Sequence, residues 1–264
     1  MALEREAKQT SDVPAASSQD IGKMLELVKG STSVELKMTV PDANHRAAIR
    51  GLGFDPVEAQ PRQAYFFDTP DLALNKAGMI VRARRIQGGR GDTVVKLRPV
   101  DPATIDNSLR RSQGFKIELD AMPGGFVCSA SFKGVCTAQE ALDVAAGEAR
   151  LASLFSKEQR AFYAAHAPAG IKIDSLVPLG PAFLLKVRHP PKDFGRRIDV
   201  EMWLYPDGSR IFEISTKCLP KESFQVAAEF RAHLARCGIE VTAVEETKTK
   251  RALEFFSADY RRDA

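Results

Sequence analysis

Two neighbouring stretches of the sequence carry pairs of basic residues spaced two positions apart on an apolar background. Arg82 and Arg84 lie in the first stretch, and Lys96 and Arg98 lie in the second. Successive side chains of a β-strand point to opposite faces, so each pair would share one face of its strand. Four cations on adjacent strands are unusual for a solvated sheet face. The pattern favours a surface that holds a multiply charged anion.

Charged and apolar residues alternate in the same way elsewhere in the chain. Strand-like alternation is present at residues 33–40, 62–68, 79–87, 92–99, 115–120, 184–188, 197–204 and 211–217. Each segment taken alone is most simply explained as an antiparallel strand with one solvated face. About eight such strands are also enough to close a barrel, whose inward positions come from one side of each strand. We therefore expect the charged faces to line a polar barrel interior.

Apolar residues recur with helical spacing between and after these strands. Helices are expected at residues 43–52, 137–165 and 224–236, with a short one around residues 21–28. Amphipathic helices need an apolar surface to cover, and the outside of a barrel supplies one. The sequence therefore predicts an α+β fold, an eight-stranded antiparallel β-barrel with helices packed outside. We expect a flexible tail over residues 1–30 and one domain over residues 31–264, with a helical insertion around residues 137–165.

Composition restricts the class of partner and the compartment. The chain has 38 Lys and Arg against 34 Asp and Glu, a net charge of +4, which is too mild a balance to indicate nucleic-acid binding. No secretory signal is recognisable at the start, and no apolar run reaches transmembrane length. The four cysteines form no Cys-x-x-Cys pair and are expected to be reduced thiols. We therefore expect a soluble cytoplasmic protein with no membrane or nucleic-acid partner.

Common catalytic motifs are missing from the sequence. The glycine-rich residues 88–91 join two predicted strands and are interpreted as a hairpin loop, because they lack the Gly-Lys-Ser/Thr ending of a P-loop. The four histidines show no His-Glu-x-x-His pattern, and no Gly-x-Ser-x-Gly elbow is present. Trp203 shares a strand face with Asp199 and Glu201, and packing is its simplest role.

The predicted strand faces carry both signs of charge. Arg and Lys on successive strands bind phosphoryl oxygens, Arg often through two hydrogen bonds at once. Carboxylates on facing strands hold hard divalent cations through oxygen ligands. A cation held in this way neutralises phosphate charge and orients an attacking water or hydroxyl, which is most of what phosphoryl transfer needs. The residue types thus favour binding of a phosphate-rich anion together with a metal ion.

The order of these segments resembles that of the CYTH domain, the family of the triphosphate tunnel metalloenzymes. The family's Glu-x-Glu-x-Lys signature is similar to Ser-Val-Glu-Leu-Lys at residues 33–37. The later family strands look like residues 65–70, 78–84, 93–96, 115–120, 186–188, 199–201 and 213–215. Thr247 and Lys248, with residues 251–253, are similar to the closing Ser-Lys motif. The resemblance extends from residue 31 to about residue 256.

The resemblance implies a tunnel barrel that hydrolyses inorganic or organic triphosphates, or cyclises ATP, with Mg²⁺ or Mn²⁺. The substrate would be a triphosphate-containing small molecule such as tripolyphosphate, ATP or thiamine triphosphate. By the same resemblance, Glu35 and Lys37 would be catalytic. The residues implied to bind the substrate are Lys37, Arg82, Arg84, Lys96, Arg98, Lys186, Arg188 and Lys248. Those implied to surround the metal are Glu35, Glu118, Asp120, Glu201 and Glu213.

Two positions depart from the family pattern. Ser33 stands where the signature has its first Glu, and Ser215 stands where the last strand repeats Glu-x-Glu. Each change removes a carboxylate and weakens the case for a two-metal site. Triphosphate hydrolysis is the favoured function, with ATP cyclisation as an alternative. A second alternative, favoured by the two serines, is a barrel that binds polyphosphate or a nucleotide without turnover. The sequence does not indicate an oligomeric state.

Overall fold

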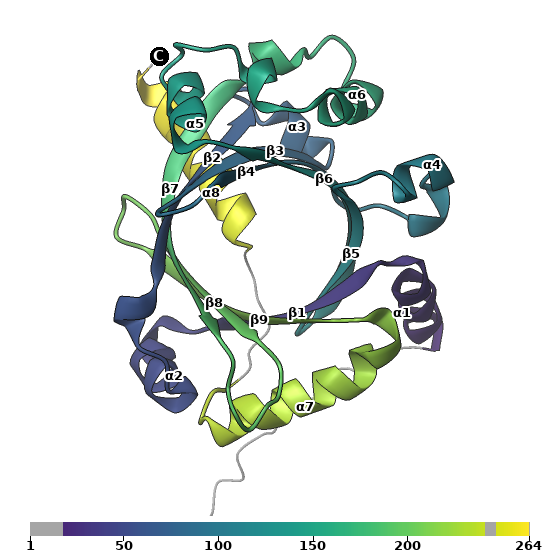
Figure 1. Cartoon of the computed structure of the whole chain (residues 1–264), viewed down its shortest axis with the longest axis vertical. Helices are drawn as coiled ribbons and strands as arrows, with labels where there is room; N and C mark the ends of the chain where they lie inside the picture. The colour runs from purple at the N-terminus through teal and green to yellow at the C-terminus, as the bar shows by residue number, and fades with distance from the viewer. Residues whose placement is uncertain (1–17, 241–246, 264) are drawn as a thin grey trace, which may run out of the picture.

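The computed structural model describes residues 18–240 and 247–263, and its strands close into a single barrel (Figure 1). Around the ring the strands follow the order β1-β5-β6-β4-β3-β2-β7-β8-β9. Their bounds are β1 Ser33–Val40, β2 Gln60–Asp68, β3 Met79–Ile86, β4 Gly91–Leu97, β5 Phe115–Met122, β6 Gly125–Cys136, β7 Val177–His189, β8 Ile198–Leu204 and β9 Arg210–Cys218. The α+β barrel predicted from the alternating segments is confirmed.

The barrel differs from the prediction in two respects. It has nine strands, because β6 forms an additional strand between β4 and β5. It is also not wholly antiparallel, since β1 pairs in parallel with β5 while every other neighbouring pair is antiparallel. The parallel pair places Glu35 directly beside Asp120. These two differences therefore affect the site as well as the fold.

Helices surround the ring of strands (Figure 1). Their bounds are α1 Ser18–Gly30, α2 His45–Leu52, α3 Ala73–Lys76, α4 Asn107–Arg110, α5 Ala138–Ala145, α6 Lys157–His166, α7 Ser223–Arg236 and α8 Lys248–Asp263. The helices expected at 43–52 and 224–236 are present, and the segment 137–165 divides into α5 and α6. Both α5 and α6 begin with a capping box, in which Thr137 and Ser156 accept hydrogen bonds from the backbone three residues on.

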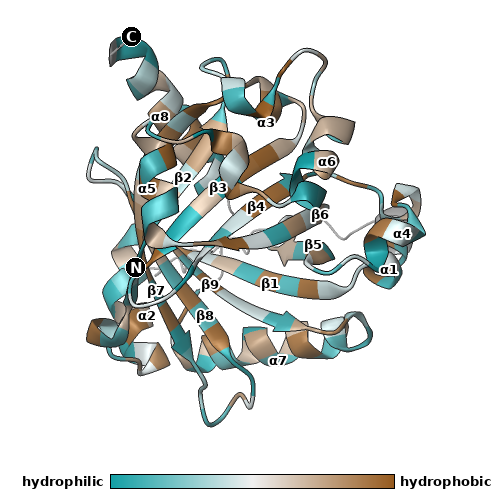
Figure 2. Ribbon diagram, turned by 45° about the horizontal axis from the view of Figure 1, so that its top comes forward, coloured by the Kyte–Doolittle hydropathy of each residue, from teal (hydrophilic) through white to brown (hydrophobic). Residues whose placement is uncertain are grey.

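The main hydrophobic core lies between the outer face of the barrel and these helices. Phe115 and Phe132 meet Phe162 of α6 with ring centroids 5.8 and 5.5 Å apart. Gly134 allows α6 to approach β6 closely, because a Cβ at that position would lie 2.5 Å from the side chain of Gln159. The alternation of hydrophobic and hydrophilic colour along the strands reflects this division between an apolar outside and a polar inside (Figure 2).

A second, smaller apolar cluster fills part of the barrel interior. It joins Phe66, Leu184 and Trp203 of the strands to Leu253 and Phe256 of α8. The start of α8 lies within the ring of strands in Figure 1. From there α8 extends from the β8–β9 turn to the β2–β3 turn, where it makes contacts through Arg251 and Ser257. The helix therefore covers one end of the barrel.

The division into a flexible tail over residues 1–30 and a domain over residues 31–264 remains a prediction. Residues 1–17 lie outside the described residues. The helix expected around residues 21–28 is present as α1, and its Val28 is buried in the main core. Among the described helices, none is long and apolar enough to span a membrane.

Candidate functional site

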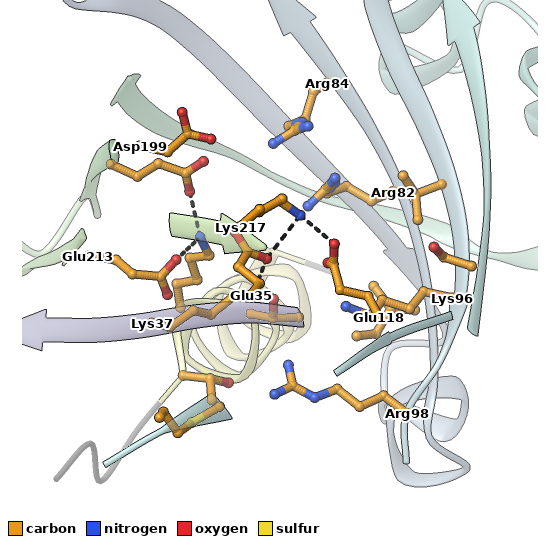
Figure 3. Close-up of a pocket in the computed structure, with 18 of the residues that line it drawn as sticks. Glu35, Lys37, Arg82, Arg84, Lys96, Arg98, Glu118, Asp199, Glu213 and Lys217 are labelled. Carbon is orange, nitrogen blue, oxygen red and sulfur yellow. Dashed lines mark hydrogen bonds and ion pairs between the residues drawn. The ribbon is translucent and has the colours of Figure 1, made fainter. Parts of the chain in front are cut away.

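The barrel encloses a cavity of about 210 Å³ lined mainly by charged side chains (Figure 3). Its basic lining residues are Lys37, Arg82, Arg84, Lys96, Arg98, Lys133, Lys186, Lys217 and Lys248. Its acidic lining residues are Glu35, Glu118, Asp199, Glu201 and Glu213. Cations thus outnumber carboxylates along the wall. The alternation of each strand explains the arrangement, because residues two apart share the inward face.

The cavity opens at the end that α8 does not cover. Lys217 lies near the end of β9, away from the β8–β9 turn, and its side chain is 38 % exposed. Lys133 lies near the end of β6 and is also exposed. At the covered end, Thr247, Lys248 and Thr249 form part of the wall. The site is therefore a pocket whose entrance lies at the end marked by Lys217 and Lys133.

Asp120 is the most deeply buried charge at the site, with a side chain that is 0 % exposed. Three cations surround it: its oxygens lie 3.0 Å from Nζ of Lys37, 3.5 Å from Nη2 of Arg98 and 3.8 Å from Nζ of Lys96. Neither carboxylate oxygen accepts a hydrogen bond of good geometry from a described residue. Burial raises the pKa of Asp120, but Lys37 and Lys96 outweigh burial and hold it below its usual value.

A second carboxylate, that of Asp92, forms ion pairs with both arginines of β3. Asp92 on β4 is paired directly with Arg84 on β3. Its carboxylate accepts hydrogen bonds of 2.9 Å from Nε and 2.6 Å from Nη2 of Arg84. Arg82 reaches the same carboxylate at 3.4 Å. Burial and the neighbouring Arg84 lower the pKa of Arg82 to about 10. One carboxylate therefore compensates two guanidinium groups.

A third group lies at the covered end, where Lys248 joins two strands. Its Nζ donates to Glu201 at 2.5 Å and to Glu213 at 2.6 Å. Glu201 also accepts hydrogen bonds from Lys186 at 2.9 Å and from the indole of Trp203 at 3.1 Å. Burial lowers the pKa of Lys248, but the two glutamates outweigh burial and raise it. The first residue of α8 is thus held by charge inside the barrel.

A fourth group combines Glu35, Glu118 and Lys217. The ammonium of Lys217 contacts Glu118 and lies 3.3 Å from Glu35. Glu35 also lies 3.2 Å from Nζ of Lys37. Burial raises the pKa of Glu35, but Lys37 and Lys217 outweigh burial and bring the pKa well below its usual value. Glu35 is therefore ionised at neutral pH.

The oxygens of three carboxylates are arranged as a cation site would require. Glu35, Glu118 and Asp120 each offer an oxygen, and these oxygens lie within 4.8 Å of one another. An all-oxygen donor set suits hard ions such as Mg²⁺ or Mn²⁺. The two hydrogen-bond-free oxygens of Asp120 also have lone pairs available for a cation. The residues present therefore fit a divalent metal ion.

The excess of cations at the site contributes to a lowered pKa of Lys96. Burial, together with the neighbouring Lys37 and Arg98, lowers that pKa to about 8 despite the attraction of Asp120. Lys133 makes no ion pair with any described residue, and although its side chain reaches solvent, partial desolvation lowers its pKa too. A buried cation whose charged form is disfavoured is stabilised by an incoming anion. The wall is therefore suited to a multiply charged anion.

Most residues singled out in the sequence meet at this cavity. The cavity is lined by Lys37, Arg82, Arg84, Lys96, Arg98, Lys186, Lys248, Glu35, Glu118, Glu201 and Glu213. Asp120 is covered by these lining side chains and contacts Lys37. Arg188 is exposed, lies opposite Asp199, and is not among the lining residues. Glu201 and Glu213 are held by Lys248 and are not part of the three-carboxylate group.

Sequence reasoning missed two of the charged residues at the site. Lys133 belongs to β6, the strand that was not predicted. Asp92 shares the inward face of β4 with Lys96, and Arg98 continues that alternation just past the strand, so the pattern that identified those two contained a signal for Asp92 as well. Lys217 and Asp199 belong to the alternating segments 211–217 and 197–204, but the sequence pattern implied no site role for either.

Comparison with known proteins supports the fold. No family model matches the sequence, and no curated protein does so. A solved structure of HpAC1 from Hippeastrum, a candidate adenylyl cyclase described as having a dominant triphosphatase activity, aligns with a TM-score of 0.62 and 16 % identity over 87 % of this chain and 95 % of that one. A candidate adenylate cyclase from Bacillus halodurans aligns with a TM-score of 0.59 and 16 % identity over 84 % and 97 %. The tunnel-barrel fold expected from the CYTH resemblance is therefore confirmed.

Proposed function

We propose that the protein binds the triphosphate group of a small molecule inside the barrel and hydrolyses it with the help of Mg²⁺ or Mn²⁺. The observation that carries the proposal is the excess of buried cations along the wall, expressed in the pKa of about 8 for Lys96. Several phosphoryl groups in a row would supply the negative charge that the wall lacks. The triphosphatase activity described for the Hippeastrum neighbour agrees with this substrate class.

The binding roles follow from position on the wall. Arg82 and Arg84 on β3 form one row, and Lys96 on β4 with Arg98 just after that strand forms the adjacent row, so that each row can contact successive phosphates. Guanidinium groups bind phosphoryl oxygens through paired hydrogen bonds, so the arginines would also fix the orientation of the chain. Lys186 on β7 and Lys248 at the start of α8 would complete the contacts, beside Glu201.

The catalytic roles fall to the group around Asp120. Mg²⁺ or Mn²⁺ bound there would neutralise phosphate charge and orient the attacking water. Glu35, Glu118 and Asp120 would hold the cation through their oxygens. Lys37 is protonated at neutral pH, because Glu35 and Asp120 outweigh burial and raise its pKa well above the usual value. Its ammonium would stabilise the charge that develops as the oxygen of water bonds to the phosphorus and the anhydride oxygen leaves.

ATP cyclisation is the second candidate, because both neighbours are described as adenylyl or adenylate cyclase candidates. Two observations favour hydrolysis instead. The cavity of about 210 Å³ is smaller than the roughly 300 to 1,000 Å³ of typical sites for drug-sized ligands. None of the described residues that line it is aromatic, so they offer no stacking surface for a base. A nucleoside would have to project from the entrance.

One set of assays separates the candidates. The protein is incubated with tripolyphosphate, ATP or thiamine triphosphate, with and without Mg²⁺ or Mn²⁺, and released phosphate and cyclic AMP are both measured. We expect metal-dependent phosphate release and no cyclic AMP. Cyclic AMP formed from ATP would favour the cyclase. Tripolyphosphate binding by calorimetry with no turnover of any of the three substrates would contradict both enzymatic functions and leave a binding protein.

A further inference from the structure

Lys217 lies between two of the three carboxylates that fit a metal ion. Figure 3 shows its ammonium pointing at Glu35 and Glu118, which come from different strands. The backbone fixes this placement, because Lys217 on β9 is paired directly with Glu35 on β1. The side chains of Glu35 and Glu118 are only 12 % exposed, so the surrounding residues restrict the conformations that the two carboxylates can adopt. The contact is therefore built into the register of the barrel.

The two serines that depart from the family pattern belong to the same group. Ser215 donates a hydrogen bond to Oε1 of Glu35 at 3.2 Å. Ser33 donates to Oε2 of Glu118 at 3.4 Å, and that oxygen is the one that Lys217 contacts. The chain thus places its own donors at both oxygens of Glu35 and at Oε2 of Glu118. Asp120 differs, since its oxygens accept no hydrogen bond of good geometry from the described residues.

An ammonium and a divalent cation cannot both use the same face of this carboxylate pair. Mg²⁺ binds oxygens at about 2.0 to 2.1 Å and repels a neighbouring positive charge. Lys217 lies 3.3 Å from Oε2 of Glu35, so its ammonium stands where a cation bridging the pair would bind. Its side chain is 38 % exposed, against 15 % for Lys37, which leaves Lys217 free to swing toward the entrance.

We propose that Lys217 is a built-in counter-cation that competes with the divalent metal ion for Glu35 and Glu118. The inference rests on the proposed function, because the same carboxylates are taken there as the metal ligands. The metal ion binds only when the ammonium of Lys217 is displaced. Lys217 therefore weakens metal binding while it keeps the carboxylate pair compensated in the metal-free protein. The serines support the lysine by holding the two carboxylates in place.

The direct test is the affinity for Mn²⁺, measured by electron paramagnetic resonance on the full chain without substrate. Lys217→Met removes the charge and keeps the length of the side chain. We expect it to bind Mn²⁺ at least about tenfold more tightly than wild type, a difference of about 1.4 kcal/mol. Lys133→Met is the matched control, because Lys133 lines the same cavity and makes no ion pair with a described residue.

The control separates competition from general electrostatics. Removing any positive charge from the cavity favours a cation somewhat, so Lys133→Met should change Mn²⁺ affinity by less than about threefold. Equal gains in the two variants would overturn the proposal, as would unchanged or weaker Mn²⁺ binding by Lys217→Met. Mn²⁺ binding by the variant alone, with none in wild type, would support it. No Mn²⁺ binding by either protein would overturn it.

A second measurement does not depend on the folding of Lys217→Met. In wild type with ¹³C-labelled lysine side chains, the Cε signal that is missing from Lys217→Arg belongs to Lys217. We expect this signal to shift during a Mg²⁺ titration, because the ammonium leaves the carboxylates. A signal that stays in place while Mg²⁺ binds would contradict displacement. Tripolyphosphate binding to the wild-type protein is measured in parallel, in the presence of a chelator. If wild type did not bind tripolyphosphate, the proposed function would be contradicted, but the competition between Lys217 and the metal ion would not.

Discussion

Individual carboxylates at this site each compensate more than one cation. Asp92 is shared by Arg82 and Arg84, and Asp120 by three basic residues. Such sharing leaves the buried cations only partly neutralised, which costs free energy in the folded protein. The cost is recovered when an anion binds, so the same residues link stability to binding.

The first prediction concerns Asp92→Asn. The substitution leaves two guanidinium groups, each less than 20 % exposed, without their carboxylate. We expect the free energy of unfolding to fall by roughly 2 to 3 kcal/mol, measured by chemical denaturation. Tripolyphosphate should stabilise the variant more than it stabilises wild type, because it replaces the lost negative charge. Equal stabilisation of the two proteins would mean that the anion does not reach these arginines.

The second prediction concerns pH. Lys96 has a pKa of about 8 in the free protein, so it loses its charge as the pH rises above that value. A bound anion favours the charged form, and each pH unit above the free pKa lowers the affinity by up to about tenfold. Tripolyphosphate affinity, measured by calorimetry with a chelator present, should therefore fall more steeply between about pH 8 and 9 in wild type than in Lys96→Met. Parallel pH profiles would contradict a role for Lys96 in binding.

At the scale of elements, β6 and α8 shape the site most, and the sequence indicated neither in full. β6 contains Ser129, Ala130, Ser131 and Gly134, whose small side chains mask the alternation that marks the other strands. Their size is explained by tertiary packing, since Gly134 lies against Gln159 of α6. The family motif located Lys248, but the periodicity gave no sign that the helix following it covers one end of the barrel. Packing against distant strands cannot be derived from local pattern.

The third prediction tests the docking of α8. Trp203 is the only tryptophan of the chain and is buried in the inner cluster with Leu253. Leu253→Asp places a charge in that cluster and should release α8, since an unpaired buried charge is strongly unfavourable. We expect the tryptophan emission to shift to longer wavelength while the far-ultraviolet circular dichroism of the barrel is retained. Glu254→Gln, at an exposed position of the same helix, should leave the emission unchanged.

An unshifted emission maximum in Leu253→Asp would contradict the role of α8 as a cover. The same variant offers a second measure of the pocket. With α8 released, Lys248 no longer holds Glu201 and Glu213 together. Glu201 would keep only Lys186 as a counter-charge, and Glu213 would lie without its Lys248 partner beside the bound anion. Tripolyphosphate binding should weaken accordingly, as measured by calorimetry. Unchanged binding would place the anion away from the covered end.

For the whole molecule, alternation along the strands predicted the barrel and most of its charged interior. It succeeded because the inward face of each strand repeats every second residue, as at Arg82 and Arg84. It failed where contacts depend on which strands are neighbours. The parallel pairing of β1 with β5 brings Glu35 beside Asp120, and the pairing of β1 with β9 brings Lys217 opposite Glu35. Neither pairing can be derived from the local pattern of one strand.

The central claim is that the barrel interior binds the triphosphate group. Its most direct test is a calorimetric titration of tripolyphosphate into wild type, Lys96→Met and Arg84→Met, with Lys157→Met on the exposed start of α6 as the control. Each interior substitution should weaken binding by at least about tenfold, or about 1.4 kcal/mol, while the control binds as wild type does. Wild-type affinity in both interior variants would contradict the claim, because the anion would then bind outside the barrel.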